Sequence, residues 1–184
     1  MTKDYTPKKY TDLENIEACS TIVTNLMPEA LGRLYVERHF PVIARYHINK
    51  MLEMIRLAYS STLDQSSWMD KETLLYALVK LQSIESMVGY QDWIMDDGKL
   101  DKYYEKALYE GDKEFLEYIV SLHVIKSDEI FLKWNQTATR QNIGAVHPLF
   151  VNAFYHDKSN YVSLPAAFLG YPFYKYGRID TCFY

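Results

Sequence analysis

The chain has 184 residues and 48% of them are hydrophobic, which indicates one globular domain or slightly more and argues against a mainly disordered protein. Its 20 Lys and Arg residues against 24 Asp and Glu give a net charge of −4, so no nucleic acid or anionic membrane surface is expected as its main partner. The two cysteines, Cys19 and Cys182, exclude a disulfide framework and a four-thiolate zinc site, and leave open one bond between them. Aromatic residues make up 15% of the chain, with 17 tyrosines, which is more than core packing alone requires.

Residues 1–18 form a polar lead without the apolar stretch that a signal peptide needs. No run of about 18 apolar residues occurs elsewhere, so we expect no membrane segment in this chain. Either the protein acts in the cytosol, or the chain is a piece of a longer protein whose targeting signal lies upstream.

Residues 19–143 carry apolar residues mostly at helical spacing. Pro28 predicts a helix start, because proline lacks only an amide hydrogen that is unpaired in the first turn, and Pro41 predicts a break or a kink in this helix. Within this helix, the apolar face is predicted to consist of Ala30, Leu31, Leu34 and Tyr35. A second amphipathic helix is predicted around residues 48–59.

Three further helices are predicted before the pattern changes. Asp70 is a good N-cap for one of them, which we expect to run to Gly89 as a left-handed C-terminal cap. The sequence Asp-Asp-Gly at 96–98 predicts a turn, followed by helices over about 100–109 and 112–134.

From residue 144 onward, the spacing of apolar residues favours β-strands over helices. Two short runs rich in Val, Tyr and Phe flank five polar residues, 156–160, which predicts a β-hairpin whose second strand ends at Pro165. The fold class is therefore mainly α, a helical bundle followed by a short C-terminal β-hairpin.

The helical region shows no reactive constellation. None of the histidines lies in a metal-binding spacing, so we expect them to face solvent or to be merely hydrogen-bonded; they are His39, His47, His123, His147 and His156. The sequence also contains no glycine-rich phosphate loop and no Gly-x-Ser-x-Gly elbow.

The hairpin offers a possible binding edge. Asn152 is unusual inside a predicted strand, which suggests a partner for its side chain, and Ala153 is small enough for another backbone to approach. Such an edge could take a peptide as an added strand. The alternative is an aromatic hairpin packed on the helices, with Asn152 hydrogen-bonded locally.

Several motifs resemble the neprilysin and endothelin-converting-enzyme family of zinc endopeptidases. PEALGRLYVERHF, WMDKET and KLQSIESMVGYQDWI are similar to family segments at family-like spacing, and the likeness extends from about Cys19 to Phe173. The strongest likeness is VNAFYHDKSNYVSLPAAFLGYPFY, in which the residues in register are Asn152, Ala153, Phe154, Tyr155, Asn160, Pro165, Ala166, Leu169, Pro172 and Phe173.

The resemblance implies a division of the chain and a set of roles. Residues 19–143 resemble the family's N-terminal peptidase domain, 144–174 its substrate-strand segment, and 175–184 form a divergent tail. By this resemblance, Asn152 binds substrate backbone, Ala153 makes a main-chain contact, and Phe154 lines the pocket before the cleaved bond. The pocket after that bond is formed by Phe168 and Phe173. This second pocket is expected to be altered, because Ala167 replaces the usual glycine and Phe168 a branched aliphatic residue.

The zinc site of the family is missing from this sequence. Family members hold zinc with His-Glu-x-x-His and a later Glu, and the chain contains no such motif, so no metal is expected to bind it. We therefore interpret the chain as a fragment or truncated member of a larger neprilysin-like ectodomain that binds peptides but is inactive alone. The resemblance also places the disulfide partner of Cys19 in an N-terminal part that this chain lacks.

Two other interpretations stay open. The chain could be a non-catalytic peptide-binding or regulatory module of the same family, or an incomplete gene model. Family members are type II plasma-membrane or secreted proteins, which implies an extracellular location for the parent protein.

Overall fold

The computed structural model describes residues 11–107, 114–134, 137, 139–140 and 145–175. The elements are α1 (Asp12–Leu26), α2 (Pro28–His39), α3 (Val42–Asp64), α4 (Lys71–Gln82), β1 (Glu85–Gly89), the short 3₁₀ helix η1 (Asp92–Met95), α5 (Asp97–Tyr104), a second 3₁₀ helix η2 (Glu105–Ala107), α6 (Phe115–Trp134), β2 (Phe154–His156) and β3 (Tyr161–Pro165). The mainly α class with a short β element near the end of the chain is confirmed.

Helix starts follow local signals. Pro28 is the first residue of α2, and Pro41 separates α2 from α3, as predicted. Asp70 caps α4, because its Oδ1 accepts the backbone N–H of Thr73 at 2.9 Å. Helix α1, which begins at Asp12 within the polar lead, was not predicted. Its cap is Thr11, which forms a capping box with Glu14.

The predicted end of α4 at Gly89 is wrong. The helix stops at Gln82, and residues 85–89 form β1, which pairs in parallel with β3. Gly89 does have a positive φ of 82°, but it closes a strand instead of a helix. Parallel pairing with β3 supplies the backbone partners that a longer helix would have provided.

The predicted turn at 96–98 is also different in the structure. Asp96 Oδ1 accepts the backbone N–H of Lys99 at 3.0 Å, so this segment begins α5 instead of reversing the chain. The predicted start of the last helix at 112 and the predicted residues 108–109 lie outside the described residues.

The sheet has the order β1-β3-β2. The predicted hairpin is confirmed, since β2 and β3 are antiparallel and β3 ends at Pro165. Its first strand begins only at Phe154, so Asn152 precedes the strand instead of lying inside it. Among the described strands, β2 has a neighbour on one side only.

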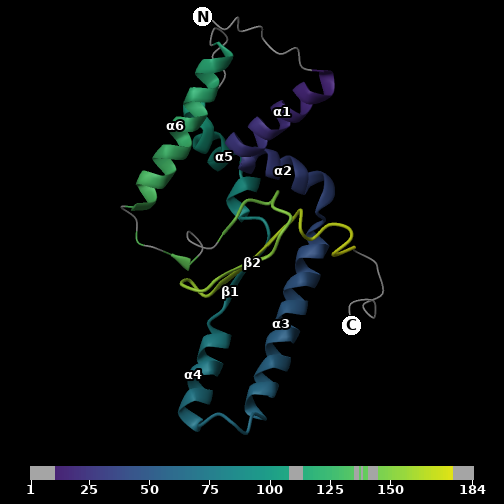
Figure 1. Cartoon of the computed structure of the whole chain (residues 1–184), viewed down its shortest axis with the longest axis vertical. Coiled ribbons are helices and arrows are strands. Elements are labelled where there is room, and N and C mark those ends of the chain that lie inside the picture. The colour runs from purple at the N-terminus through teal and green to yellow at the C-terminus, as the bar shows by residue number, and fades with distance from the viewer. Residues whose placement is uncertain (1–10, 108–113, 135–136, 138, 141–144, 176–184) are drawn as a thin grey trace, which may run out of the picture.

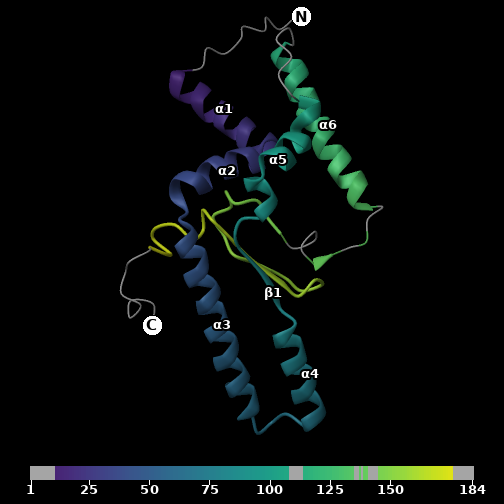
Figure 2. The same ribbon diagram turned by 180° about the vertical axis from the view of Figure 1, so that it is seen from behind.

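The sheet lies in the middle of an elongated molecule (Figures 1 and 2). Helices α3 and α4 project together from one end, and α1 and α6 lie at the other. The main core surrounds the sheet and consists of Val36, Phe40, Ala44, Ile48, Val88, Tyr90, Ile94, Ala166 and Leu169. A second core joins α1, α5 and α6 through Leu26, Tyr104, Leu122 and Ile125.

The buried face of α2 matches the predicted one only in part. Ala30 and Tyr35 pack against the two cores, as predicted. Val36 and Gly32 are buried, whereas Leu34 is 50% exposed. The reason is a close approach by Pro148, whose Cγ would lie 2.5 Å from a Cβ at position 32. No helix in the described part of the chain has the length and apolar character needed to cross a membrane.

Candidate functional site

Asn152 and Ala153 lie exposed just before the edge strand β2. The side-chain Oδ1 of Asn152 accepts the backbone N–H of Ala153 at 2.8 Å, so the expected partner of Asn152 is a local one. This local bond competes with strand pairing, which explains why β2 begins only at Phe154. Both residues are therefore accessible to another chain at the open side of β2.

Phe154 is the centre of a row of aromatic rings. Its ring lies 5.5 Å from that of Phe150 in an edge-to-face arrangement and 6.4 Å from that of His156. Phe150 in turn stacks on His147 at 4.0 Å. Phe154 and His156 share one face of β2, because successive side chains of a strand alternate. The row forms an apolar wall beside the edge strand.

Phe168 and Phe173 form a separate pair, with ring centroids 4.9 Å apart. Phe168 packs against the main core, and Phe173 is 54% exposed. Their segment is tied to the loop before β2, because the backbone N–H of Ala167 donates to Pro148 O at 2.9 Å. The five predicted binding residues therefore lie in two groups. One group contains Asn152, Ala153 and Phe154, and the other is the Phe168–Phe173 pair.

Asn160 fixes the hairpin to the rest of the fold. It has a φ of 50° at the turn, and its Nδ2 donates to Lys80 O at 2.9 Å and to Ser83 Oγ at 2.8 Å. Its Oδ1 accepts the hydroxyl of Tyr155 at 3.0 Å. An asparagine in a turn is a visible signal, but nothing local indicates the contacts with α4.

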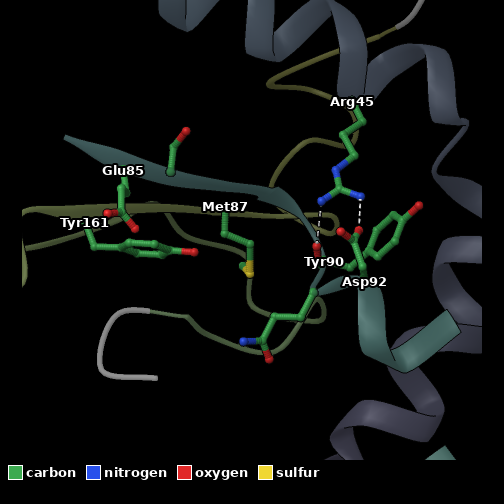
Figure 3. A pocket seen from close by; sticks show the side chains of 8 residues that line it. Arg45, Glu85, Met87, Tyr90, Asp92 and Tyr161 are labelled. Atoms are coloured by element: carbon green, nitrogen blue, oxygen red, sulfur yellow. Dashed lines mark hydrogen bonds and ion pairs between the residues drawn. The ribbon is translucent and has the colours of Figure 1, made fainter. Parts of the chain in front are cut away.

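A polar pocket of about 310 Å³ lies at the β1 end of the sheet (Figure 3). Arg45 on α3 donates to Asp92 at 2.5 Å and to Tyr90 O at 3.3 Å, and its guanidinium lies 4.6 Å from the Tyr90 ring centroid. Burial raises the pKa of the Tyr161 hydroxyl, and the charge of Glu85 adds to this effect. The described residues lining this pocket contain no nucleophile next to a general base, so it is suited to polar binding instead of covalent chemistry.

Two histidines differ from the sequence prediction. His39, His47 and His123 are exposed, as expected, but His147 and His156 are half-buried. Each of these two has a buried ring nitrogen, Nδ1 and Nε2 respectively, that has no hydrogen-bond partner among the described residues. Burial lowers the pKa of His147, and the charge of Lys126 adds to this shift. Stacking in the aromatic row, which no local pattern predicts, accounts for their burial.

A second missed feature is a carboxylate–tyrosine cluster between α2, α5 and α6. Tyr104 donates its hydroxyl to Glu29 Oε2 at 2.9 Å, and Tyr103 donates to Glu129 Oε2 at 2.7 Å. Burial raises the pKa of Glu29, although the hydrogen bond from Tyr104 opposes that shift. Burial also raises the pKa of both tyrosines, and the Glu29 charge adds to it. The cluster therefore links α2 to α5 and α5 to α6.

No three His, Cys, Asp or Glu side chains in the described part of the chain come together as a metal site requires. Cys19 is exposed on α1 and forms no disulfide with a described residue, and Cys182 lies outside the described residues. The residues that are described therefore do not fit a zinc centre.

Comparison with known proteins identifies the family. The model of peptidase family M13 matches residues 3–91. Neprilysin-1 of Trittame loki is 35% identical over 160 residues, which cover 86% of this chain and 22% of that protein. Neprilysin of Homo sapiens is 32% identical over 158 residues, which cover 85% of this chain and 21% of that protein. The chain belongs to peptidase family M13.

Solved M13 structures agree with the fold. Mycobacterium tuberculosis zinc metalloprotease ZMP1 in complex with an inhibitor has a TM-score of 0.63 and 28% identity, covering 84% of this chain and 22% of that one. The open state of the same protease has a TM-score of 0.69 and 26% identity, covering 92% of this chain and 24% of that one. The chain thus spans about a fifth of the length of the M13 relatives it matches.

Proposed function

We propose that this chain supplies the peptide-binding edge of an M13-type peptidase. The observation that carries this proposal is the exposed pair Asn152 and Ala153 next to β2, an edge strand with one neighbour among the described strands. An extended peptide pairs with such an edge through main-chain hydrogen bonds, which give affinity without requiring a particular sequence. Asn152 then exchanges its local bond to Ala153 for one to the peptide backbone.

Aromatic side chains supply the preference for apolar peptide residues. Phe154 and its neighbouring rings form one contact surface, and the Phe168–Phe173 pair forms a second, partly exposed one. In the M13 family these two positions flank the cleaved bond, and we carry that assignment over as part of the proposal. Ala167 and Phe168 are larger than the residues usual in the family at these positions. Their bulk leaves less room for a large peptide side chain at the second surface.

Peptide hydrolysis by the M13 relatives is zinc chemistry, and we assign no zinc ligand to this chain. Its sequence has no His-Glu-x-x-His, and the described donors do not converge on one point. We therefore infer that the chain binds peptides without cleaving them when it is alone. By the same family relation we place the parent protein outside the cell, membrane-anchored or secreted, which surface labelling of the tagged full-length protein tests.

Fluorescence anisotropy with a labelled peptide rich in Phe and Leu tests the binding edge. We expect the intact chain to bind and Asn152→Ala to weaken binding by about tenfold, as the loss of one hydrogen bond implies. Asn49→Ala is a matched control, because Asn49 is also exposed and bonded to nearby backbone, but lies on α3. Absence of binding by the intact chain would overturn the proposal.

The same sample tests the absence of catalysis. Hydrolysis of the labelled peptide that stops on addition of a chelator would show that the chain holds a working metal site. A separate outcome concerns the regulatory alternative: if the chain binds peptide and also lowers the turnover of added human neprilysin, a non-catalytic regulatory role is favoured over that of a catalytic part.

A further inference from the structure

An apolar groove of about 250 Å³ lies where α3 and the end of α4 meet the sheet, and it shares Ser86 with the polar pocket. Four of its lining residues lie on α3, and Leu81 lies near the end of α4. Both helices project from the sheet (Figures 1 and 2). Ser86 of β1 and Val162 of β3 form its floor. The remaining lining residues are Leu52, Ile55, Arg56, Tyr59, Leu81 and Ile84.

The two helices expose more apolar surface than this groove alone. Trp68, at the tip of the projection, is 78% exposed. Other large apolar side chains that are more than half exposed are Met54, Ile55, Leu57, Tyr59, Leu75, Tyr76 and Val79. Ile55 and Tyr59 line the groove itself, so part of this exposed apolar surface belongs to it.

Arg56 places a positive charge at the border of the groove. Its Nη2 donates to Ile84 O at 2.9 Å, and the side chain is half-buried. No carboxylate in the described part of the chain pairs with it. An occupant that covers the groove also removes the Arg56 guanidinium from water, which costs free energy if the charge stays unpaired. The groove therefore favours an occupant with a negative charge facing Arg56.

We propose that the groove between α3 and α4 binds an amphipathic helix from the part of an M13 protein outside these 184 residues, with an Asp or Glu of that helix facing Arg56. The matched segment is only 22% of Neprilysin-1 of Trittame loki, so most of such a protein is available to cover this surface. The proposal is independent of the peptide-binding edge. That edge is β2, whereas the groove is lined by residues of β1 and β3 in a sheet with the order β1-β3-β2.

The backbone around the groove favours a helical occupant. Hydrogen bonds within α3 and α4 already use their backbone groups, so the walls offer side chains and few free backbone partners. A helix satisfies its own backbone, whereas a strand laid between two helices does not. A second copy of this chain is disfavoured, because a two-fold contact would place like Arg56 charges across the same interface.

Assembly with the rest of an M13 protein tests the proposal. The 184-residue chain is produced together with the parts of Trittame loki Neprilysin-1 on either side of the matched 160 residues, and the tagged remainder is purified. We expect the chain to co-purify and amide exchange in α3 and α4 to slow. Ile55→Glu and Arg56→Gln should each lower the captured amount about tenfold. Arg56→Gln removes the charge and leaves an amide donor on a shorter side chain.

Two controls separate the groove from the fold and from the peptide edge. Ile130→Glu on α6 changes a residue that is 67% exposed, against 57% for Ile55, and should assemble like the wild type. Asn152→Ala should also assemble normally, even where it loses peptide binding. The proposal is overturned if the wild-type chain does not assemble, or if the groove variants assemble as well as Ile130→Glu. Formation of a dimer that Ile55→Glu dissociates would instead identify a second copy as the occupant.

Discussion

Gly89 lies where β1 ends against the core, and replacing it with alanine perturbs two properties at once. Its φ is 82°, in the region that favours glycine, and a non-glycine residue there costs about 1–2 kcal/mol. An alanine Cβ would lie 2.5 Å from Cε1 and 2.9 Å from Cζ of Phe40. Phe40 is 5% exposed and packs edge-to-face on Tyr90, so its ring has little room to move.

The expected loss of stability follows from these two effects. Overpacking a buried ring costs about 1–3 kcal/mol, so Gly89→Ala should lower the free energy of unfolding by about 2–5 kcal/mol in all. For a chain of this size, each kcal/mol corresponds to about 2–4 °C in Tm, which predicts a decrease of roughly 4–20 °C. Urea and thermal unfolding followed by circular dichroism measure both quantities.

Gly98→Ala is the matched control. Gly98 lies in the first turn of α5, and the nearest atom to its Cβ would be Asp96 Oδ1 at 3.6 Å, so stability should stay the same or rise by up to about 1 kcal/mol. A double-mutant cycle with Phe40→Leu should show a coupling of about 1 kcal/mol or more, because the smaller side chain relieves the clash. If Gly89→Ala is as stable as Gly98→Ala, the steric and conformational reasoning is refuted.

Three further predictions each concern one hydrogen-bonded side chain. Asn160→Ala removes the bonds to α4 and the Tyr155 partner, and should cost about 2–4 kcal/mol in urea unfolding; an unchanged midpoint would contradict the role of Asn160 as an anchor. Asp70→Ala removes the cap of α4 and should cost about 1 kcal/mol by the same assay, with Asp70→Asn retaining most of it. Burial raises the pKa of the Glu29 carboxyl above its ordinary 4.5. The folded chain therefore binds the carboxyl proton more tightly than the unfolded chain, and the resulting stabilisation is lost as pH rises through the folded pKa. Glu29→Gln keeps an acceptor for Tyr104 without the charge and should therefore gain stability relative to the wild type between pH 4.5 and 7.5; a relative loss over that range would reverse the assigned sign.

Local signals in the sequence determined several helix starts and the hairpin. Pro28, Pro41 and Asp70 act through backbone groups within a few residues, so their effects are visible in the sequence alone. Thr11 and Glu14 carry the Thr-x-x-Glu pattern of a capping box, so α1 also has a local signal, although its polar surroundings obscure it. The family motifs likewise depend only on residue type and spacing, which is why the sequence alone is sufficient to indicate a neprilysin-like peptidase.

Only the tertiary structure decided which segments face each other. Residues 85–89 form a strand instead of a helical turn because β3, more than seventy residues later, supplies their partners. Gly32 is buried because Pro148 approaches it, and Asn160 reaches Lys80 from the far end of the hairpin. Hydrogen bonds and packing between residues so distant in sequence leave no periodic pattern along the chain. The exposed groove around Arg56 was invisible for the same reason: its apolar spacing is that of an ordinary buried helix face, and only the fold shows that this part of it has no cover among the described residues.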